Sequence, residues 1–288
     1  MADRATRVDS PITLTFKNGP TVHRLGLGAM RITGPGVWGP PRDENEAIAL
    51  LRRAVDKGVN FIDTADSYGP GVSETLIAKA LHPYPAGLVI ASKGGLTRPG
   101  PGSWAVDCRP EYLRRVCADS LRRLRLDRIE LYQLHAVDHR VPIEDSIGAL
   151  ADLQREGKIR HIGVSNVSTA DLSRARAVAD IVSVQNCYNL RDRSSDALID
   201  ICAEAGIAFI PHYPLAKGRL TAAHGSPLDW IALHHDATPA QIALAWLLHR
   251  SPAMLPIPGT SSIAHFEENL GAAFIRLDAG ELRTLAAR

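Results

Sequence analysis

The chain alternates between short apolar runs, each closed by a polar side chain, and segments with the apolar period of a helix. Apolar residues recur every three or four positions in eight segments: 44–57, 74–81, 110–124, 143–156, 170–179, 195–205, 239–250 and 263–272. Six apolar runs end at or next to a polar residue: Asp63, Lys93, His135, Ser165, Gln185 and His212. This alternation predicts an α/β fold, the (β/α)8 TIM barrel, in which all strand carboxyl ends open onto one face.

Residues 12–23 precede the barrel pattern. Two alternating runs joined by a Lys-Asn-Gly-Pro turn predict an antiparallel β-hairpin that plugs the barrel floor. The first barrel strand is expected at 24–28 and the last at 254–257, because their apolar character suits burial on both faces of a parallel sheet. We expect one domain over residues 1–288, with the hairpin at 12–23 and the barrel and a C-terminal helix at 24–288.

Charge and hydropathy exclude several classes of partner. The 33 Lys and Arg residues nearly balance the 31 Asp and Glu residues, so no strong overall field attracts nucleic acid or an anionic membrane. The N-terminus has no apolar signal segment, and no apolar stretch is long enough to span a bilayer. We expect a cytoplasmic protein with no nucleic-acid or membrane partner. The sequence predicts no particular oligomeric state.

Metal binding is not expected. The four cysteines show no CxxC spacing and are predicted to be buried or half-buried thiols: Cys108, Cys117, Cys187 and Cys202. His234-His235-Asp236 resembles a ligand cluster, but adjacent helical residues point about 100° apart and the supporting ligands are missing. We interpret it as a helix end at the surface.

Two strand-to-helix connections are unusually long. One spans 31–43 and carries Trp38, and the other spans 96–108 and carries Trp104. Long loops in a compact barrel are usually functional, and both would rise above the face where the strands end. We predict that the two tryptophans form walls of a substrate pocket. The alternative for each tryptophan is a mobile surface position with no role in binding.

Four side chains suggest a proton donor for a carbonyl substrate. A phenol is a weak acid, with a reference pKa of about 10. An ammonium nearby favours the phenolate, and a carboxylate holds the ammonium in place, which are roles available to Tyr68, Lys93 and Asp63. His135 could then donate a hydrogen bond to the substrate oxygen. Taken singly, Asp63 is more often a helix cap or a structural ion pair than a catalytic residue, and His135 is equally consistent with a core histidine and with a ligand contact.

Seven segments in register closely resemble those of the aldo-keto reductase superfamily. They are Leu25-Gly26-Leu27-Gly28-Ala29-Met30, Phe61-Ile62-Asp63-Thr64-Ala65 with Tyr68-Gly69, Ser92-Lys93, His135, Gly163-Val164-Ser165-Asn166, Val184-Gln185-Asn186-Cys187-Tyr188-Asn189 and Ile257-Pro258-Gly259-Thr260-Ser261-Ser262. The resemblance implies an NADPH-dependent reductase of aldehydes or ketones on a (β/α)8 barrel. It also implies a catalytic tetrad of Asp63, Tyr68, Lys93 and His135.

The same resemblance implies the cofactor and substrate residues. For the nicotinamide end they are Gly28, Met30, Ser165, Asn166, Gln185 and His212, with His212 at the position of the family's stacking aromatic ring. For the remainder of the cofactor they are Tyr213, Pro214, Leu215, Lys217, Gly218, Gly259, Thr260, Ser261, Ser262, His265, Glu268 and Asn269. The implied substrate pocket comprises Met30, Trp38, Tyr68, Trp104 and His135.

Cofactor preference and substrate are less constrained. The segment 259–265 has no Lys or Arg where strict NADPH enzymes often place them, although hydroxyls and a helix N-terminus there favour a phosphate. We expect a modest preference for NADP(H), with NAD(H) as an alternative cofactor. Residues 82–85 and 258–265 resemble a bacterial subgroup linked to pyridoxal-type aldehydes. Two rivals are a cofactor-binding regulatory subunit with little turnover and a non-redox barrel isomerase or lyase.

Overall fold

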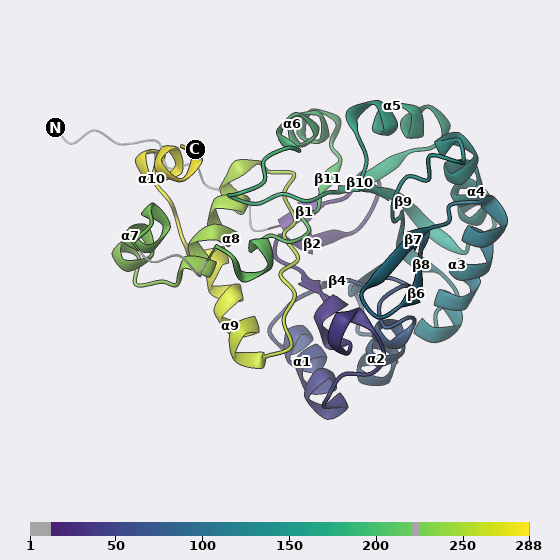
Figure 1. Cartoon of the computed structure of the whole chain (residues 1–288), viewed down its shortest axis with the longest axis horizontal. Coiled ribbons are helices and arrows are strands. Elements are labelled where there is room, and N and C mark those ends of the chain that lie inside the picture. Colours follow the sequence, from purple (N-terminus) through teal and green to yellow (C-terminus); the bar gives the residue numbers. More distant parts are fainter. Residues whose placement is uncertain (1–12, 221–224, 288) are drawn as a thin grey trace.

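The computed structural model describes residues 13–220 and 225–287, and its centre is a curled sheet of seven parallel strands (Figure 1). Neighbouring strands follow one another in the order β3-β4-β5-β8-β9-β10-β11. Their bounds are β3 Leu27–Gly28, β4 Phe61–Asp63, β5 Val89–Gly94, β8 Ile129–Leu134, β9 Ile159–Ser165, β10 Ile181–Gln185 and β11 Ala208–Phe209. The predicted (β/α)8 architecture is confirmed.

The segment 254–257 occupies the place of the eighth strand and closes the barrel. Leu255 N–H donates to the Phe209 carbonyl at 2.9 Å, and Gly26 N–H donates to the Pro256 carbonyl at 3.0 Å. Pro256 has no N–H to continue a regular ladder. The closure therefore consists of isolated backbone contacts on both sides, where the sequence predicted a full strand.

Ten α-helices are present in the described part of the chain, most of them on the outside of the sheet (Figure 1). Their bounds are α1 Glu44–Asp56, α2 Val72–Leu81, α3 Pro110–Leu124, α4 Ile143–Arg155, α5 Thr169–Val178, α6 Asp196–Ala205, α7 Pro227–His234, α8 Pro239–Arg250, α9 Ile263–Gly271 and α10 Ala279–Ala286. All eight predicted segments and the C-terminal helix are found, with ends shifted by up to two residues. Helix α7 is not among the predicted segments, although its end at His234 agrees with the helix end expected there.

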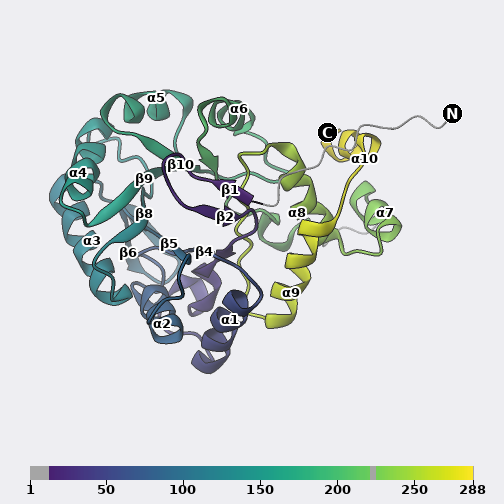
Figure 2. The ribbon, with the colours of Figure 1, turned by 180° about the vertical axis from the view of Figure 1, so that it is seen from behind.

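The N-terminal hairpin lies across the end of the barrel that is opposite the carboxyl ends of the strands, as the view from behind shows (Figure 2). Its strands are β1 (Thr13–Thr15) and β2 (Thr21–His23), paired antiparallel. Inward-facing Phe16 stacks on Phe61 of β4 with ring centroids 5.9 Å apart, and the hairpin shares one apolar cluster with the barrel interior. The predicted plug is confirmed, except that residue 12 lies outside the described residues.

The two long connections form short helices and a hairpin above the face where the barrel strands end. Residues 29–37 contain two short 3-10 helices, η1 (Ala29–Ile32) and η2 (Pro35–Val37). The second connection is a hairpin of β6 (Leu96–Gly100) and β7 (Ser103–Val106), where the sequence suggested an irregular loop. The two connections meet through Gly102 N–H and the Gly36 carbonyl at 3.2 Å.

One expectation about α7 is wrong. The sequence gave no supporting ligand beside His234 and His235, but the carboxylate of Glu281 on α10 lies within 3.0 Å of both rings. Glu281 is more than forty residues away along the chain, so only the packing of α10 against α7 brings it there. The four cysteines are free, and all except the half-buried Cys187 are buried, as predicted.

Candidate active site

A buried ion pair forms where β4 and β5 end. Lys93 Nζ lies 2.6 Å from Asp63 Oδ2, with 0% and 2% of the two side chains exposed. The ammonium also donates to the Thr64 carbonyl at 2.9 Å. Burial lowers the pKa of Lys93, and the adjacent Asp63 carboxylate opposes that shift. The pair is held in place because neither charge has water as an alternative partner.

Two glutamine amides complete the environment of Asp63. Gln185 Nε2 donates to Asp63 Oδ1 at 2.8 Å, and Gln133 Nε2 donates to the same oxygen at 3.3 Å. Gln133 was not predicted, although a glutamine inside the apolar run 129–134 was a signal that could have identified it. Since the Gln185 amide nitrogen is directed at Asp63, its carbonyl oxygen remains as an acceptor for a ligand.

Tyr68 lies beside this pair in the loop between β4 and α2. Lys93 Nζ is 3.4 Å from the Tyr68 hydroxyl oxygen and 5.1 Å from the ring centroid. The predicted contact is present, but the expected fall in the phenol pKa is not. Burial raises the pKa of Tyr68 well above its usual value, and the Asp63 carboxylate adds to the rise. Tyr68 is therefore protonated at neutral pH.

His135 follows β8 and faces Tyr68 from the other side. The two rings meet edge to face with centroids 5.9 Å apart. The Ser67 hydroxyl oxygen lies 3.4 Å from His135 Nδ1. Burial, with Lys93 and His212 contributing, lowers the pKa of His135 well below its usual value, so the imidazole is neutral at pH 7.

A chain of polar contacts links the ends of β8 and β9 to the segment after β11. The Asn166 amide nitrogen donates to the His135 carbonyl at 2.9 Å and to the Ser165 hydroxyl at 3.0 Å. His212 Nε2 donates to Asn166 Oδ1 at 3.1 Å. Burial, reinforced by nearby lysines, lowers the pKa of His212 to about 4. The ring is therefore neutral at pH 7, and a neutral ring suits stacking on a cationic aromatic group.

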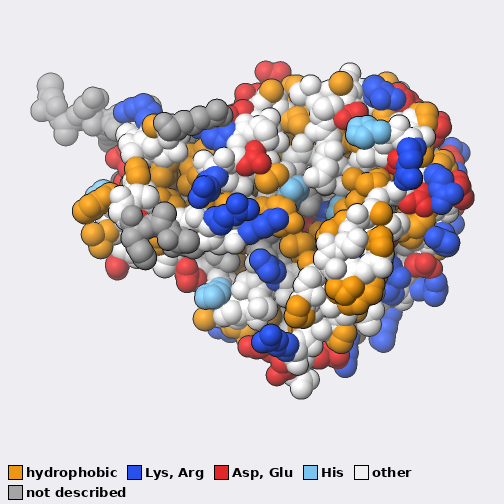
Figure 3. Space-filling model, in the orientation of Figure 1, with side chains coloured by type: hydrophobic (Ala, Val, Ile, Leu, Met, Phe, Trp, Pro, Cys, Tyr) orange, Lys and Arg blue, Asp and Glu red, His pale blue; other side chains and the backbone are white. Residues whose placement is uncertain are grey.

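These side chains border a cavity of about 930 Å³, at the upper end of the size range of ligand pockets. The cavity extends from Asp63, Tyr68 and His135 to the first turns of α8 and α9. Every predicted cofactor residue lines it except Ser261 and Ser262. In the space-filling view it is the hollow near the centre of this face, with Lys and Arg side chains along one side (Figure 3).

Besides Ser261 and Ser262, two other predicted residues do not line the cavity. Lys93 is fully buried behind Asp63 and Tyr68. Trp104 lines the cavity, whereas Trp38 does not. Sequence reasoning also missed several lining residues: Arg31, Leu96, Asp229, Thr238, Pro239, Ala240, Ile257 and Pro258. Arg31 directly follows the predicted Met30, and that adjacency was the available signal.

The sequence pattern of the Aldo/keto reductase family matches residues 24–287. The chain belongs to this family. The reductase is 48% identical over 274 residues to an uncharacterized oxidoreductase of Schizosaccharomyces pombe, covering 95% of this chain and 89% of the yeast protein. It is 46% identical over 278 residues to pyridoxine 4-dehydrogenase of Escherichia coli, covering 94% of this chain and 96% of that protein.

Solved structures of related enzymes superpose on the reductase over nearly all of its length. A glycerol dehydrogenase from Gluconobacter oxydans gives a TM-score of 0.87 at 26% identity, covering 95% of this chain and 94% of that chain. An aldo/keto reductase from Klebsiella pneumoniae in complex with NADP and acetate gives 0.81 at 30% identity, covering 95% and 94%. These findings confirm the predicted family, the barrel fold and the oxidoreductase class of the enzyme.

An arginine holds the rim of the reductase's cavity together. The Arg98 guanidinium lies 3.8 Å from the Trp104 ring centroid and 5.7 Å from that of Trp38. It donates to the backbone carbonyls of Gly36, Val37, Ser67 and Ser103. Arg98 therefore joins both long connections to the residue that precedes Tyr68.

The segment 213–217 borders the reductase's cavity with an unusual backbone. Three of its residues that are not glycine adopt the left-handed conformation: Tyr213 (φ 52°), Ala216 (φ 49°) and Lys217 (φ 58°). Such conformations are costly for residues with a Cβ and persist where the surroundings enforce them. The Lys217 ammonium lies 4.3 Å from the Tyr213 ring centroid, a cation–π contact that helps fix this shape.

Proposed function

We propose that the reductase uses Tyr68 as the proton donor when a carbonyl compound is reduced. A bound nicotinamide cofactor supplies the hydride. Tyr68 holds its proton because its pKa is raised, and Lys93 at 3.4 Å stabilises the phenolate left after transfer. Asp63 keeps Lys93 in position at 2.6 Å. The observation that carries the proposal is this uninterrupted contact from Asp63 through Lys93 to the hydroxyl of Tyr68.

His135 is proposed to orient the carbonyl oxygen. A neutral imidazole carries one proton, and we propose that the Ser67 hydroxyl donates to Nδ1, which places that proton on Nε2. Nε2 can then donate to the substrate oxygen, which gains negative charge in the transition state. Ser67 is thus a positioning residue for His135. Arg98 in turn fixes Ser67 through its backbone carbonyl at 3.1 Å.

The described residues fit a nicotinamide dinucleotide. For the carboxamide we propose Ser165, Asn166 and the free oxygen of Gln185, and for the ring face the neutral imidazole of His212. Lys217 and Arg31 both line the cavity and add positive charge for the phosphates. The cavity also reaches Thr238, the N-cap of α8, and helix N-termini favour anions.

We propose a modest preference for NADPH. Related enzymes from Klebsiella pneumoniae were crystallised with NADP and with NADPH, and Lys217 and Arg31 supply the favourable charge. The preference is modest because the carboxylates of Asp229 and Glu268 also line the cavity. Close to a 2′-phosphate, a carboxylate opposes binding, whereas it accepts a hydrogen bond from a free ribose hydroxyl.

The proposed substrate is an aldehyde, and a pyridoxal-type aromatic aldehyde is the first to test. This proposal rests on 46% identity to pyridoxine 4-dehydrogenase and on the apolar cavity residues Met30, Leu96 and Trp104, which suit an aromatic ring. We also propose that the single domain works in the cytoplasm. No helix among the described residues is long and apolar enough to cross a membrane, and its free thiols suit a reducing compartment.

Tyr68→Phe tests the proposed function. We expect the variant to bind NADPH like the unaltered enzyme but to lose roughly 10²–10⁴-fold in kcat for aldehydes, the usual contribution of a positioned proton donor. NADPH oxidation with a panel of aldehydes measures turnover, and tryptophan quenching measures binding. Tyr112→Phe on α3, outside the cavity lining, is the matched control.

The two rival functions give different results in the same assays. NADPH binding without turnover of any aldehyde by the unaltered enzyme would favour a cofactor-binding regulatory subunit. Absence of NADPH binding would favour an isomerase or lyase. A Tyr68→Phe variant that lost cofactor binding as severely as turnover would assign Tyr68 a structural role.

A further inference from the structure

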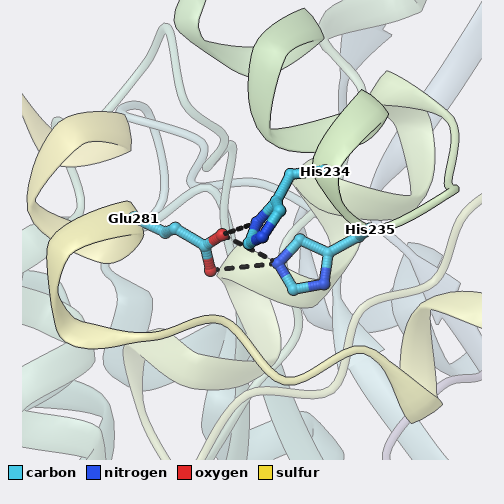
Figure 4. A group of neighbouring side chains, drawn as sticks. All are labelled: His234, His235 and Glu281. Atoms are coloured by element: carbon cyan, nitrogen blue, oxygen red, sulfur yellow. Dashed lines mark hydrogen bonds and ion pairs between the residues drawn. The ribbon is translucent and has the colours of Figure 1, made fainter.

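Three potential metal ligands from two helices converge outside the active site (Figure 4). His234 ends α7, His235 follows it directly, and Glu281 belongs to the first turn of α10. The ligand atoms of these three residues all lie within 4.8 Å of one another. We propose that His234, His235 and Glu281 form a binding site for a divalent transition-metal ion of the Zn²⁺ class, which joins α7 to α10.

The local backbone explains how adjacent histidines reach a common point. His235 is the C-cap of α7 and has left the helix, with φ −93° and ψ 4°. The two rings meet at 67° with centroids 5.2 Å apart, instead of diverging as they would inside a helix. Both then face the same carboxylate (Figure 4).

The atoms and distances fit a shared ion. His234 Nδ1 lies 3.0 Å from Glu281 Oε1, and His235 Nε2 lies 2.9 Å from the same oxygen. Ligands bound at about 2.0–2.2 Å to one ion stand about 3 Å apart or slightly more. Two imidazoles and a carboxylate are a donor set that suits Zn²⁺, Ni²⁺ and Cu²⁺ better than Ca²⁺ or Mg²⁺.

A hydrogen bond from a residue that is not itself a ligand, together with partial burial of the site, supports metal binding. Glu281 Oε2 accepts a hydrogen bond from Asp278 N–H at 2.9 Å, which fixes the carboxylate as second contacts do at metal sites. Only 12% of Glu281 is exposed, and 20% of His235. His234 is 75% exposed, so one side of the site is open to water, which would fill the remaining coordination positions.

The competing interpretation is a hydrogen-bonded cluster in which each ring donates a proton to Glu281. Binding of an ion requires an unprotonated nitrogen on each ring, so the ion and the donated proton exclude one another at that atom. The interpretations therefore differ in a measurable way. A hydrogen-bonded cluster alone gives no saturable metal binding that depends on all three side chains.

Zinc titration of the full-length enzyme, loaded with NADP⁺ to occupy the active-site cavity, tests the proposal. We expect one ZnCl₂ equivalent to bind per chain by calorimetry and to raise the midpoint of thermal unfolding, because an ion that binds only the folded state stabilises it. Glu281→Gln retains an oxygen for Asp278 but lacks the charge. It and His234→Ala should each weaken this binding about tenfold or more, whereas exposed His139→Ala should not.

Two results would overturn the proposal. One is the absence of saturable zinc binding by the unaltered enzyme. The other is zinc binding of equal affinity in the unaltered enzyme, Glu281→Gln and His234→Ala, which would place the ion elsewhere. Far-ultraviolet circular dichroism of each variant shows whether α7 and α10 remain folded, so that loss of binding is assigned to the ligands.

Discussion

The two ends of the cavity differ in how their polar groups are held. At the tetrad end, the buried Asp63 carboxylate has three side-chain donors, namely Lys93, Gln133 and Gln185. At the far end, Lys217 and Arg31 are exposed and face a wall that also contains Glu268. The residues proposed for chemistry are fixed in advance, whereas those proposed for the cofactor's tail are surface side chains.

This difference separates a rigid, buried part of the site from a flexible, exposed part. A fixed, dry arrangement of dipoles needs little reorganisation during a reaction, and this is a major source of catalysis. Binding of phosphates at a surface tolerates flexible side chains and falls with ionic strength. Substitutions at the tetrad end should therefore affect folding and turnover strongly, and those at the far end should affect mainly cofactor affinity.

Lys93→Met should give the largest effect. Removing the ammonium leaves the Asp63 carboxylate buried without its charge partner, and breaking such a pair typically costs about 3–5 kcal/mol of unfolding free energy. Urea unfolding measures the loss. Lys79→Met, which breaks the exposed Lys79–Glu44 pair, is the matched control and should cost about 1 kcal/mol or less.

The double variant Lys93→Met/Asp63→Asn identifies the cause. If an uncompensated charge is responsible, removing it as well should restore part of the lost stability. A double variant no more stable than Lys93→Met would instead point to lost packing, and the contrast between the two ends would then not rest on burial of charge.

The dependence of the unfolding free energy on pH should show whether His212 is shielded from water. The pKa of His212 is about 4 in the folded enzyme and about 6.5 in an unfolded chain, so the unfolded state binds more protons between these values. Stability should fall as the pH drops from about 6.5 towards 4, by up to about 1.4 kcal/mol per pH unit for this histidine. Stability from this source is fully present above pH 6.5.

Urea midpoints at pH 7 and pH 5 test this dependence. Carboxylates also contribute to acid sensitivity, so the informative quantity is the difference between the unaltered enzyme and His212→Phe. The variant should lose less stability over this interval. Equal losses would show that the imidazole of His212 is hydrated enough to keep an ordinary pKa.

Arg98→Ala tests the rim between the two ends. Loss of the guanidinium frees Trp104 and both long connections, so we expect KM for aromatic aldehydes to rise about five- to thirtyfold, which corresponds to about 1–2 kcal/mol of binding free energy. NADPH affinity should be unchanged, because Arg98 does not line the cavity. A fall in kcat at constant KM would instead indicate that Arg98 acts mainly through Ser67 and His135.

Lys217→Ala should have the smallest effect. One exposed charge near a phosphate is worth about 0.5–1 kcal/mol, which corresponds to a two- to fivefold weaker affinity for NADPH that disappears at high salt. Fluorescence titration at low and high ionic strength measures it. Arg219→Ala removes a neighbouring exposed charge outside the cavity lining and should change little.

The sequence predicted that the side chains at the tetrad end lie together, because strand periodicity indicates where each strand ends. Asp63, Lys93, His135, Ser165 and Gln185 each close or follow a strand, and in a barrel those ends converge whatever the details of the helices. The helices outside the sheet were also recovered, since their periodic patterns are local. Both inferences needed no knowledge of contacts between distant loops.

Some residues of the rim and of the cavity lining depend on such contacts and were not predicted. Arg98 lies between a threonine and a proline in a segment interpreted as a loop, and only the folded hairpin brings it against Trp38 and Trp104. Glu281 meets His234 and His235 by helix packing. Helix α7 was not among the predicted helical segments, although a helix end was expected at His234 and His235.

The left-handed residues at 213–217 have a consequence for engineering this enzyme. A glycine at any of these positions would relieve an unfavourable backbone angle. It would also increase the number of backbone conformations that the segment adopts without a ligand. With this segment at the cofactor as proposed, heat resistance and the rate of cofactor exchange would depend on the same dihedral angles. Directed evolution for survival at high temperature would accordingly alter turnover whenever it selects mutations here.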